Sequence, residues 1–487
     1  MIKTAGIKEF FYKNNLSKKL VLGSIFISVF FILFYGFFIL FYQNAVLYFS
    51  FAVGLVILLF LVFLLSTFYP NIFLLLALVS ILNPYYLYLL YTHTWRYASL
   101  RVGISSFFIL LLFITVFLRG SLRGTIQRFK TPLDTPLIAF LSFCAITTVY
   151  SFLLGNSFQL IFADLFPFLE FSAYFFIATI LIKNLKQLNF ILKGILAWLL
   201  LTSLGGIIFY FFSSHQLGYG AALGRIAVGR LADFMAAITL PLLAGLYFYV
   251  EPKARGLINK QRLLIIFLSL IPLLSLLIGF FRSLWIGVGG ALIFIFLMIL
   301  KKKRHLKAVF TVLILITILF FSIDYFFISK TQIFRGKTLS SLLLERVLHE
   351  PSESSSIAGR FQQNPFLLSE IYKSPLIGKG FGTFSGFANF YLAIPYMMGL
   401  PALFFFFWLA FVFIKYSIQV FGNVQGIYKG WVLGILASFV STALSVLFFP
   451  AILHFPIPAY LGVLAACLFL LPKFIKNLKN LEKYELP

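Results

Sequence analysis

The chain has 487 residues, of which 62% are hydrophobic, 20% aromatic and only 11% charged. Soluble domains carry about 25% charged residues, so no globular core could bury this much apolar surface. The net charge of +26 does not indicate nucleic acid binding, because the basic residues form small groups between apolar runs. We therefore expect one all-α transmembrane helical bundle over residues 1–487, embedded in the lipid bilayer and without a nucleic acid partner.

Long apolar runs recur along the chain, and a helix needs about 20 such residues to cross the hydrocarbon core. The first run follows five lysines and is too long for the core of a signal peptide, so we expect a retained helix. The predicted spans are 20–42, 45–67, 70–91, 100–118, 134–154, 158–182, 189–212, 232–250, 263–280, 284–300, 308–328, 395–414, 430–450 and 455–472. This makes fourteen spans, with twelve as the alternative because Pro and Asn interrupt 45–91.

The basic residues indicate how these spans are oriented, because cytoplasmic loops carry an excess of Lys and Arg. With the N-terminus inside, 27 of the 39 basic residues fall in cytoplasmic segments. An even number of spans returns the C-terminus to the same side. We therefore expect a multi-pass protein with both termini in the cytoplasm.

One polar segment, 329–394, is long, and in this topology it is an extracytoplasmic loop. Connections of this length in compact proteins are usually functional or disordered. The segment mixes turn formers with apolar residues. We expect it to fold against the outer surface, with a short helix near 358–373.

Arginines on the outer side are candidates for a site, because the planar guanidinium suits phosphate. Arg225 and Arg230 lie in a predicted outer loop, 213–232, where they could also be solvated loop residues. Arg282 lies in GFFRSLWIG between two apolar spans, a costly position for a charge that has no partner or ligand. The alternative is that Arg282 snorkels to the interface.

Acidic residues inside the predicted spans are the next candidates. Asp164, Glu170 and Asp233 could pair with the arginines, relay protons or act as a base. A separation of six residues places Asp164 and Glu170 about 240° apart on an ideal helix, so we do not expect a carboxylate pair. Structural ion pairs are the alternative interpretation.

No metal site or disulfide framework is expected. Cys144 and Cys467 fall in apolar runs, and the five histidines show no metal-ligand spacing. His349, beside Glu350 in the long loop, could act as a base or be a solvated residue. The stretch GKGFGTF (378–384) follows no βαβ strand, so its glycines favour tight turns rather than a phosphate loop.

Four stretches together resemble the O-antigen ligase and O-antigen polymerase superfamily. They are RSLWIGVGGALIFIF (282–296), SSSIAGRFQ (354–362), SPLIGKGFGTF (374–384) and ANFYLAIPYMMGLPALFFF (388–406). The resemblance covers about 225–410, and the order and spacing of the stretches around a long outer loop make it more specific than any one of them.

The resemblance implies a protein of the bacterial inner (cytoplasmic) membrane that transfers glycan at the outer face. The donor would be an undecaprenyl-diphosphate-linked glycan and the acceptor a lipid A core or a growing glycan, with no metal or soluble cofactor. Arg282, Arg360 and one of Arg225 or Arg230 would bind the diphosphate and stabilise it as leaving group. Further substrate-binding candidates are Gly378, Gly380, Gly382, Asn389 and Tyr391.

The chain departs from the family at one position. Ala388 stands where members usually have a histidine that is proposed to assist the acceptor hydroxyl. Glu350 and His349, or else Glu370 or Asp164, would then supply the base. If none of them does, this branch of the family does not ligate glycan or is catalytically altered.

Two other functions fit a polytopic cationic protein. A lipid-linked oligosaccharide flippase or transporter would need no base, but would favour short loops and basic residues in a central cavity. A proton-coupled carrier could use Asp164 and Glu170, but the sequence lacks the paired interrupted half-helices expected of one.

Overall fold

The structure is a computed structural model of the chain. It describes residues 71–72, 74–75, 78, 109–110, 112–114, 116, 129–223, 227–250, 260–279, 282–300, 355–383, 389–447 and 457–484. Within these residues all regular structure is α-helical. The helices are α5 (Asp134–Leu153), α6 (Phe158–Leu181), α7 (Leu185–Leu223), α8 (Ala227–Tyr249), α9 (Lys260–Gly279), α10 (Arg282–Ile299), α13 (Ser355–Lys373), α14 (Phe390–Met398), α15 (Leu400–Asn423), α16 (Gly426–Val446) and α17 (Ile457–Tyr484).

Eight of the described helices are long and apolar enough to cross a membrane, namely α5 to α9 and α15 to α17. Helix α10 has a shorter apolar stretch. These nine coincide in order with nine of the predicted spans, so the prediction of a multi-pass helical membrane protein is confirmed. The predicted spans 20–42, 45–67 and 308–328 lie outside the described residues, and only scattered helical residues of 70–91 and 100–118 lie within them. A total of fourteen therefore stays a prediction.

Two boundaries differ from the sequence prediction. The predicted loop 213–232 is largely helical, because α7 continues to Leu223 and α8 begins at Ala227. Hydropathy marks where a helix leaves the lipid and not where its backbone hydrogen bonds end. The predicted span 395–414 joins parts of two helices, since Gly399 separates α14 from α15. The φ of Gly399 is 85°, in the left-handed region, and this conformation ends α14.

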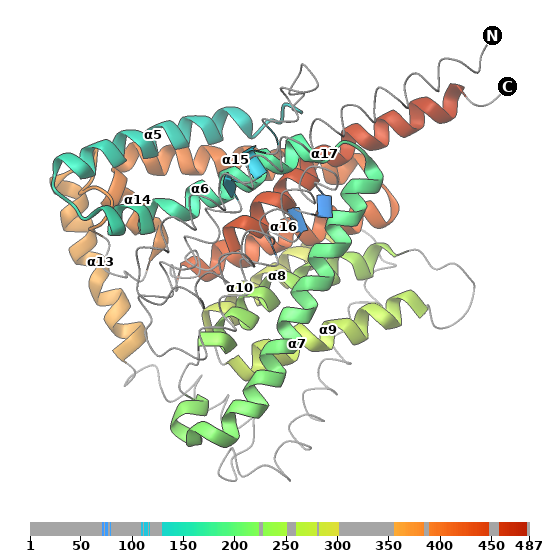
Figure 1. The fold of residues 1–487 in the computed structure, drawn as a ribbon, viewed down its shortest axis with the longest axis horizontal. Coiled ribbons are helices and arrows are strands. Elements are labelled where there is room, and N and C mark those ends of the chain that lie inside the picture. The colour runs from blue at the N-terminus through green and yellow to red at the C-terminus, as the bar shows by residue number, and fades with distance from the viewer. Residues whose placement is uncertain are drawn as a thin grey trace, which may run out of the picture.

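Helix α8 forms the centre of the bundle. In its apolar span 94% of the residues are buried, against 17% for α15 at the perimeter. Figure 1 shows α8, α10 and α16 in the middle of the molecule, with α5, α6 and α15 along one side and α7 and α9 on the other. The exposed aromatic rings of α15, including Phe404 and Phe411, are then suited to contact lipid acyl chains.

Small residues allow the central helices to approach closely. A Cβ built on Gly245 of α8 would meet the backbone of Gly434 on α16, and one on Gly462 of α17 would meet the Phe171 carbonyl of α6. In lipid, where apolar burial gives no drive for association, such close backbone packing holds helices together. Ser438 adds a hydrogen bond to the α8 backbone carbonyl at 238, worth about 0.6 kcal/mol on average for this class of contact.

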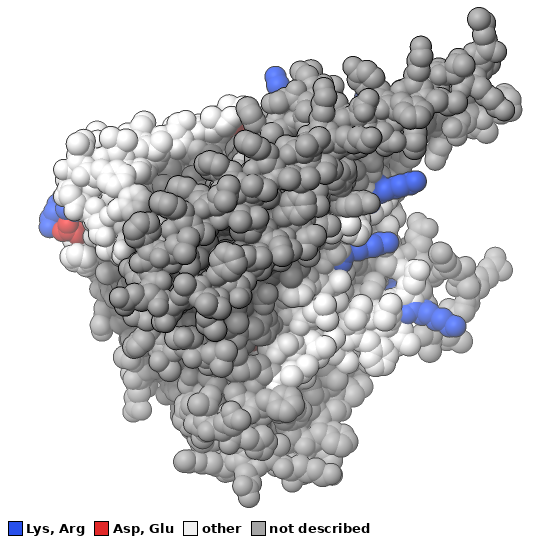
Figure 2. All heavy atoms as spheres, viewed as in Figure 1, with Lys and Arg blue, Asp and Glu red and all other residues white. Residues whose placement is uncertain are grey.

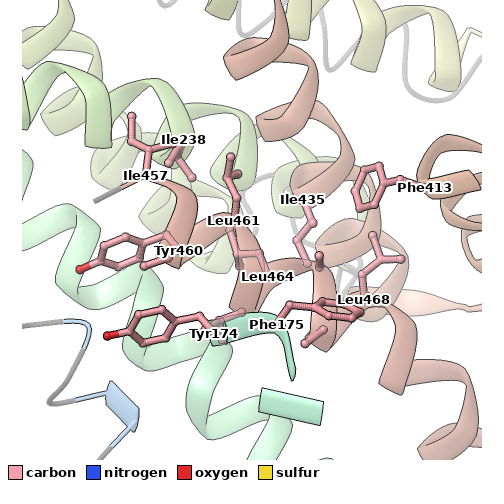
Figure 3. Close-up of a cluster of buried hydrophobic side chains, with 14 of the residues drawn as sticks. Tyr174, Phe175, Ile238, Phe413, Ile435, Ile457, Tyr460, Leu461, Leu464 and Leu468 are labelled. Carbon is pink, nitrogen blue, oxygen red and sulfur yellow. The ribbon is translucent and has the colours of Figure 1, made fainter. Parts of the chain in front are cut away.

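Large apolar side chains fill the space between the remaining helices. Figure 3 shows one buried cluster, in which side chains of α6, α8, α15, α16 and α17 meet. The ring of Phe413 lies 5.9 Å from that of Phe469, with the two nearly perpendicular. The hydroxyl of Tyr460 donates to the Leu78 carbonyl over 2.7 Å, which ties α17 to an earlier helical segment. Buried phenol groups require such a partner.

Candidate functional site

Basic side chains lie at the end of the bundle where α5, α7, α9 and α16 begin. Lys183 and Lys473 each lie over the Phe129 ring, at 5.3 and 5.1 Å from its centroid. Lys429 lies 4.5 Å from the Phe421 centroid. Figure 2 shows basic side chains along the end where α17 leaves the bundle. The helix ends that meet here are those expected to be cytoplasmic from the sequence.

The opposite end carries a glycine turn, defined here as residues 374–383, between α13 and α14. Gly378, Gly380 and Gly382 have φ values of 73°, 84° and 82°, which L side chains rarely adopt. The turn pairs with α14, because the amides of Lys379 and Gly380 donate to the carbonyls of Tyr396 and Met397. The expected use of these glycines for tight turning is therefore confirmed.

The corner between α5 and α6 holds this turn from the other side. Ser151 Oγ accepts from the Phe381 amide over 2.6 Å, and Asn156 Nδ2 donates to the Phe381 carbonyl over 2.8 Å. Asp164 Oδ2 accepts from the Gly382 amide, also over 2.8 Å. A Cβ on Gly380 would lie 2.8 Å from Ser151 Oγ. The turn therefore fits against this corner only with glycine at that position.

All five amides from 378 to 382 donate to acceptors within the protein. Besides the four just described, the Gly378 amide donates to the Ser374 carbonyl. A phosphate loop instead aims successive free amides at its ligand. Any contact of residues 378–382 with substrate therefore has to use carbonyl oxygens or side chains. The positive φ values of the three glycines are explained by the packing of the turn against its neighbours.

Asn389 and Tyr391 begin helix α14. The Asn389 side chain caps the helix by accepting from the Tyr391 amide over 3.0 Å. The Tyr391 hydroxyl donates to the Ala443 carbonyl near the end of α16, and its ring stacks on Phe407 with centroids 6.2 Å apart. These contacts connect α14 to α15 and α16.

The beginning of α10 packs against the last turns of α16. Ser445 Oγ donates to the Ser283 carbonyl over 3.2 Å, and a Cβ on Gly287 would collide with Ser441 and Ser445. The Trp285 indole donates to the Leu276 carbonyl at the end of α9. The end of α16 therefore brings the start of α10 and the start of α14 together, although they lie about 100 residues apart in the sequence.

The candidate arginines lie on helices that reach this end. Arg282 is the first residue of α10, Arg230 lies in the first turns of α8, and Arg360 lies in α13, which confirms the helix expected near 358–373. The structure describes the backbone of these three residues and not their side chains. The candidates Arg225, His349 and Glu350, and the position Ala388, lie outside the described residues.

The acidic candidates separate into different environments. Asp164 faces the glycine turn, whereas Glu170 is fully buried, so the expectation that they do not share a face is consistent with the structure. Glu370 on α13 forms ion pairs with Lys373 and Lys379. Hydrogen bonds from these two lysines hold the pKa of Glu370 below its ordinary value. Such a carboxylate is a weak base, which argues against Glu370 in that role.

Sequence reasoning singled out Asp164 but missed the other two side chains that hold the turn. Ser151 and Asn156 lie beside a short connection of two apolar spans, and nothing in their spacing marks them. Their partners lie more than 220 residues away. In the described part of the chain, no group of three His, Cys, Asp or Glu side chains gathers as around a metal ion.

Comparison with protein-family models and with curated proteins finds no relative of this chain. No protein-family model matches the chain. Likewise, no curated protein is significantly similar to it. A functional assignment therefore rests on the motifs and on the arrangement of the segments that carry them.

Proposed function

We propose that the chain transfers or polymerises glycan from an undecaprenyl-diphosphate-linked donor at the outer face of a bacterial inner membrane. It would act as a metal-independent O-antigen ligase or polymerase. The observation that supports this is the position of three motif segments at one end of the bundle: the starts of α10 and α14 both contact the end of α16, and the glycine turn pairs with the end of α14. The basic side chains at the opposite end favour a cytoplasmic location for that end.

Glycan transfer requires the protein to position donor and acceptor and to stabilise the charge on the diphosphate. An acceptor hydroxyl attacks the anomeric carbon of the donor, the new glycosidic bond forms, and the bond from that carbon to the diphosphate oxygen breaks. Arg282, Arg360 and Arg230 (or Arg225) would bind the diphosphate, and their guanidinium groups would stabilise the charge that develops on it. The hydroxyl proton would pass to a base, for which His349 and Glu350 in the outer loop, or else Asp164 beside the glycine turn, are the candidates.

A gel of surface and carrier-linked glycans tests this proposal. A strain lacking the gene should accumulate carrier-linked glycan on the outer face, and wild-type protein should restore transfer. Arg282→Ala and Arg360→Ala should not restore it, while Arg282→Lys should do so only partly, since an ammonium cannot form the bidentate contact. Arg262→Ala is the matched control, because Arg262 contacts the Val250 carbonyl at the opposite end.

The same gel separates the proposal from a flippase. If carrier-linked glycan stalls on the cytoplasmic face of the deletion strain, the chain moves the lipid-linked donor and does not consume it. Normal transfer by Arg282→Ala and Arg360→Ala at wild-type protein levels would reject the diphosphate-binding role of both arginines.

A further inference from the structure

Asp233 is a buried carboxyl that the proposed transfer does not use. It lies on the central helix α8 and is 3% exposed. Its Oδ1 accepts a hydrogen bond from the Ser275 hydroxyl of α9 over 3.2 Å. Its Oδ2 is fully buried and has no hydrogen-bond partner among the described residues.

The described groups around this carboxyl are apolar or neutral. On α7, Gly206 packs so closely that a Cβ there would collide with Ala232. On α9, the residue after Ser275 is Leu276, whose carbonyl is taken by the Trp285 indole of α10. None of the side chains described on α7, α9, α10 or α16 places a basic group against Asp233. Arg230 and Arg282, at the same end of the bundle, have undescribed side chains.

An ionised carboxylate in this position would have a high free energy. One neutral hydroxyl does not replace the hydration of a full charge, and the helices around it are themselves surrounded by lipid. The neutral acid leaves at most one O–H group without an acceptor, which costs far less than an unpaired charge. Protonation is therefore the state that fits the contacts of both oxygens.

We infer that Asp233 and Ser275 form a proton-binding site inside the bundle. The proton resides on Oδ2, and Oδ1, as the carbonyl oxygen, accepts the Ser275 hydroxyl. Release of the proton requires water or a cationic group to reach Oδ2. Asp233 can therefore become charged only when the helices separate at this end of the bundle. The inference does not rest on glycan transfer.

Infrared spectroscopy of the purified full-length protein at neutral pH tests the inference. The carbonyl stretch of a protonated carboxyl is separate from that of a carboxylate, and labelling with ¹³C-aspartate assigns it to Asp. We expect Asp233→Asn to remove an isotope-sensitive acid band. The matched control is Asp134→Asn, which should leave the band unchanged, because Asp134 lies at a helix start, where both of its side-chain oxygens accept hydrogen bonds, from the amide and the hydroxyl of Thr131.

Superimposable spectra of wild type and Asp233→Asn would overturn the inference. If that variant does not fold, Ser275→Ala serves instead. Loss of the hydroxyl donor should move the acid band to higher frequency without removing it, and a band that does not move would contradict the assignment. Wild-type protein with no isotope-sensitive acid band at all would exclude the site without any variant.

Discussion

Ser151 anchors the glycine turn through a single side-chain oxygen. Its replacement by Ala leaves the buried Phe381 amide without an acceptor, and we expect the variant to lose about 1–3 kcal/mol of stability. Thermal unfolding in detergent measures this. Ser172→Ala is the control, because the Ser172 hydroxyl donates only within its own helix, to the Phe168 carbonyl, and should cost little. Equal shifts in the two variants would contradict the anchoring role.

Glu370 makes the packing of the glycine turn sensitive to acid. Two lysines hold its pKa below the ordinary value of 4.5, so the pairing contributes stability above about pH 4.5 and loses it as pH falls through the lowered pKa. The pKa of the partner Lys379 is correspondingly raised, chiefly by its hydrogen bond to Glu370. We expect the protection of amides across 374–383 against hydrogen exchange, relative to the intrinsic exchange rate at each pH, to fall below pH 4.5 in wild type. In Glu370→Gln this pH-dependent loss should be absent, and a loss of the same size there would assign it to another group.

Among the helices, α8 and α16 depend on glycine for their contact. Gly245→Ala places a methyl group against the Gly434 backbone, and we expect a loss of about 1–3 kcal/mol from overpacking. Gly289→Ala on α10 is the matched control, because its Cβ would meet nothing within 4 Å. It should be neutral or stabilise by up to about 1 kcal/mol through helix propensity. Thermal unfolding of both variants tests the difference, and a stable Gly245→Ala would show that the helices can separate without cost.

The sequence predicted the helices well and the contacts between them poorly. Apolar runs located nine described helices in order, because a membrane helix must satisfy its own backbone and needs a fixed apolar length. The break at Gly399 was missed, because residues on both sides of it are apolar and the cause is a left-handed φ and close contact with Leu376. The partners of Phe381 were missed because they lie in a different part of the chain and carry no motif.

At the scale of the whole molecule, the two ends should lie on opposite sides of the membrane. Lys373 and Lys186 are exposed and belong to the glycine-turn end and the basic end respectively. We expect an impermeant maleimide added to right-side-out spheroplasts to label Lys373→Cys and not Lys186→Cys. The native Cys144 and Cys467 are buried and should give little background. The reverse pattern would place the glycine turn in the cytoplasm and remove the basis for transfer at the outer face.

The central claim is that this chain consumes a diphosphate-linked donor. The most direct measurement is turnover of carrier-linked glycan, extracted from the deletion strain, by purified protein in vesicles with a glycan acceptor. We expect wild-type protein to release undecaprenyl diphosphate together with a longer or transferred glycan, and Arg282→Ala at equal protein levels to release neither. Donor that stays intact with wild-type protein, or that only changes leaflet, would contradict it.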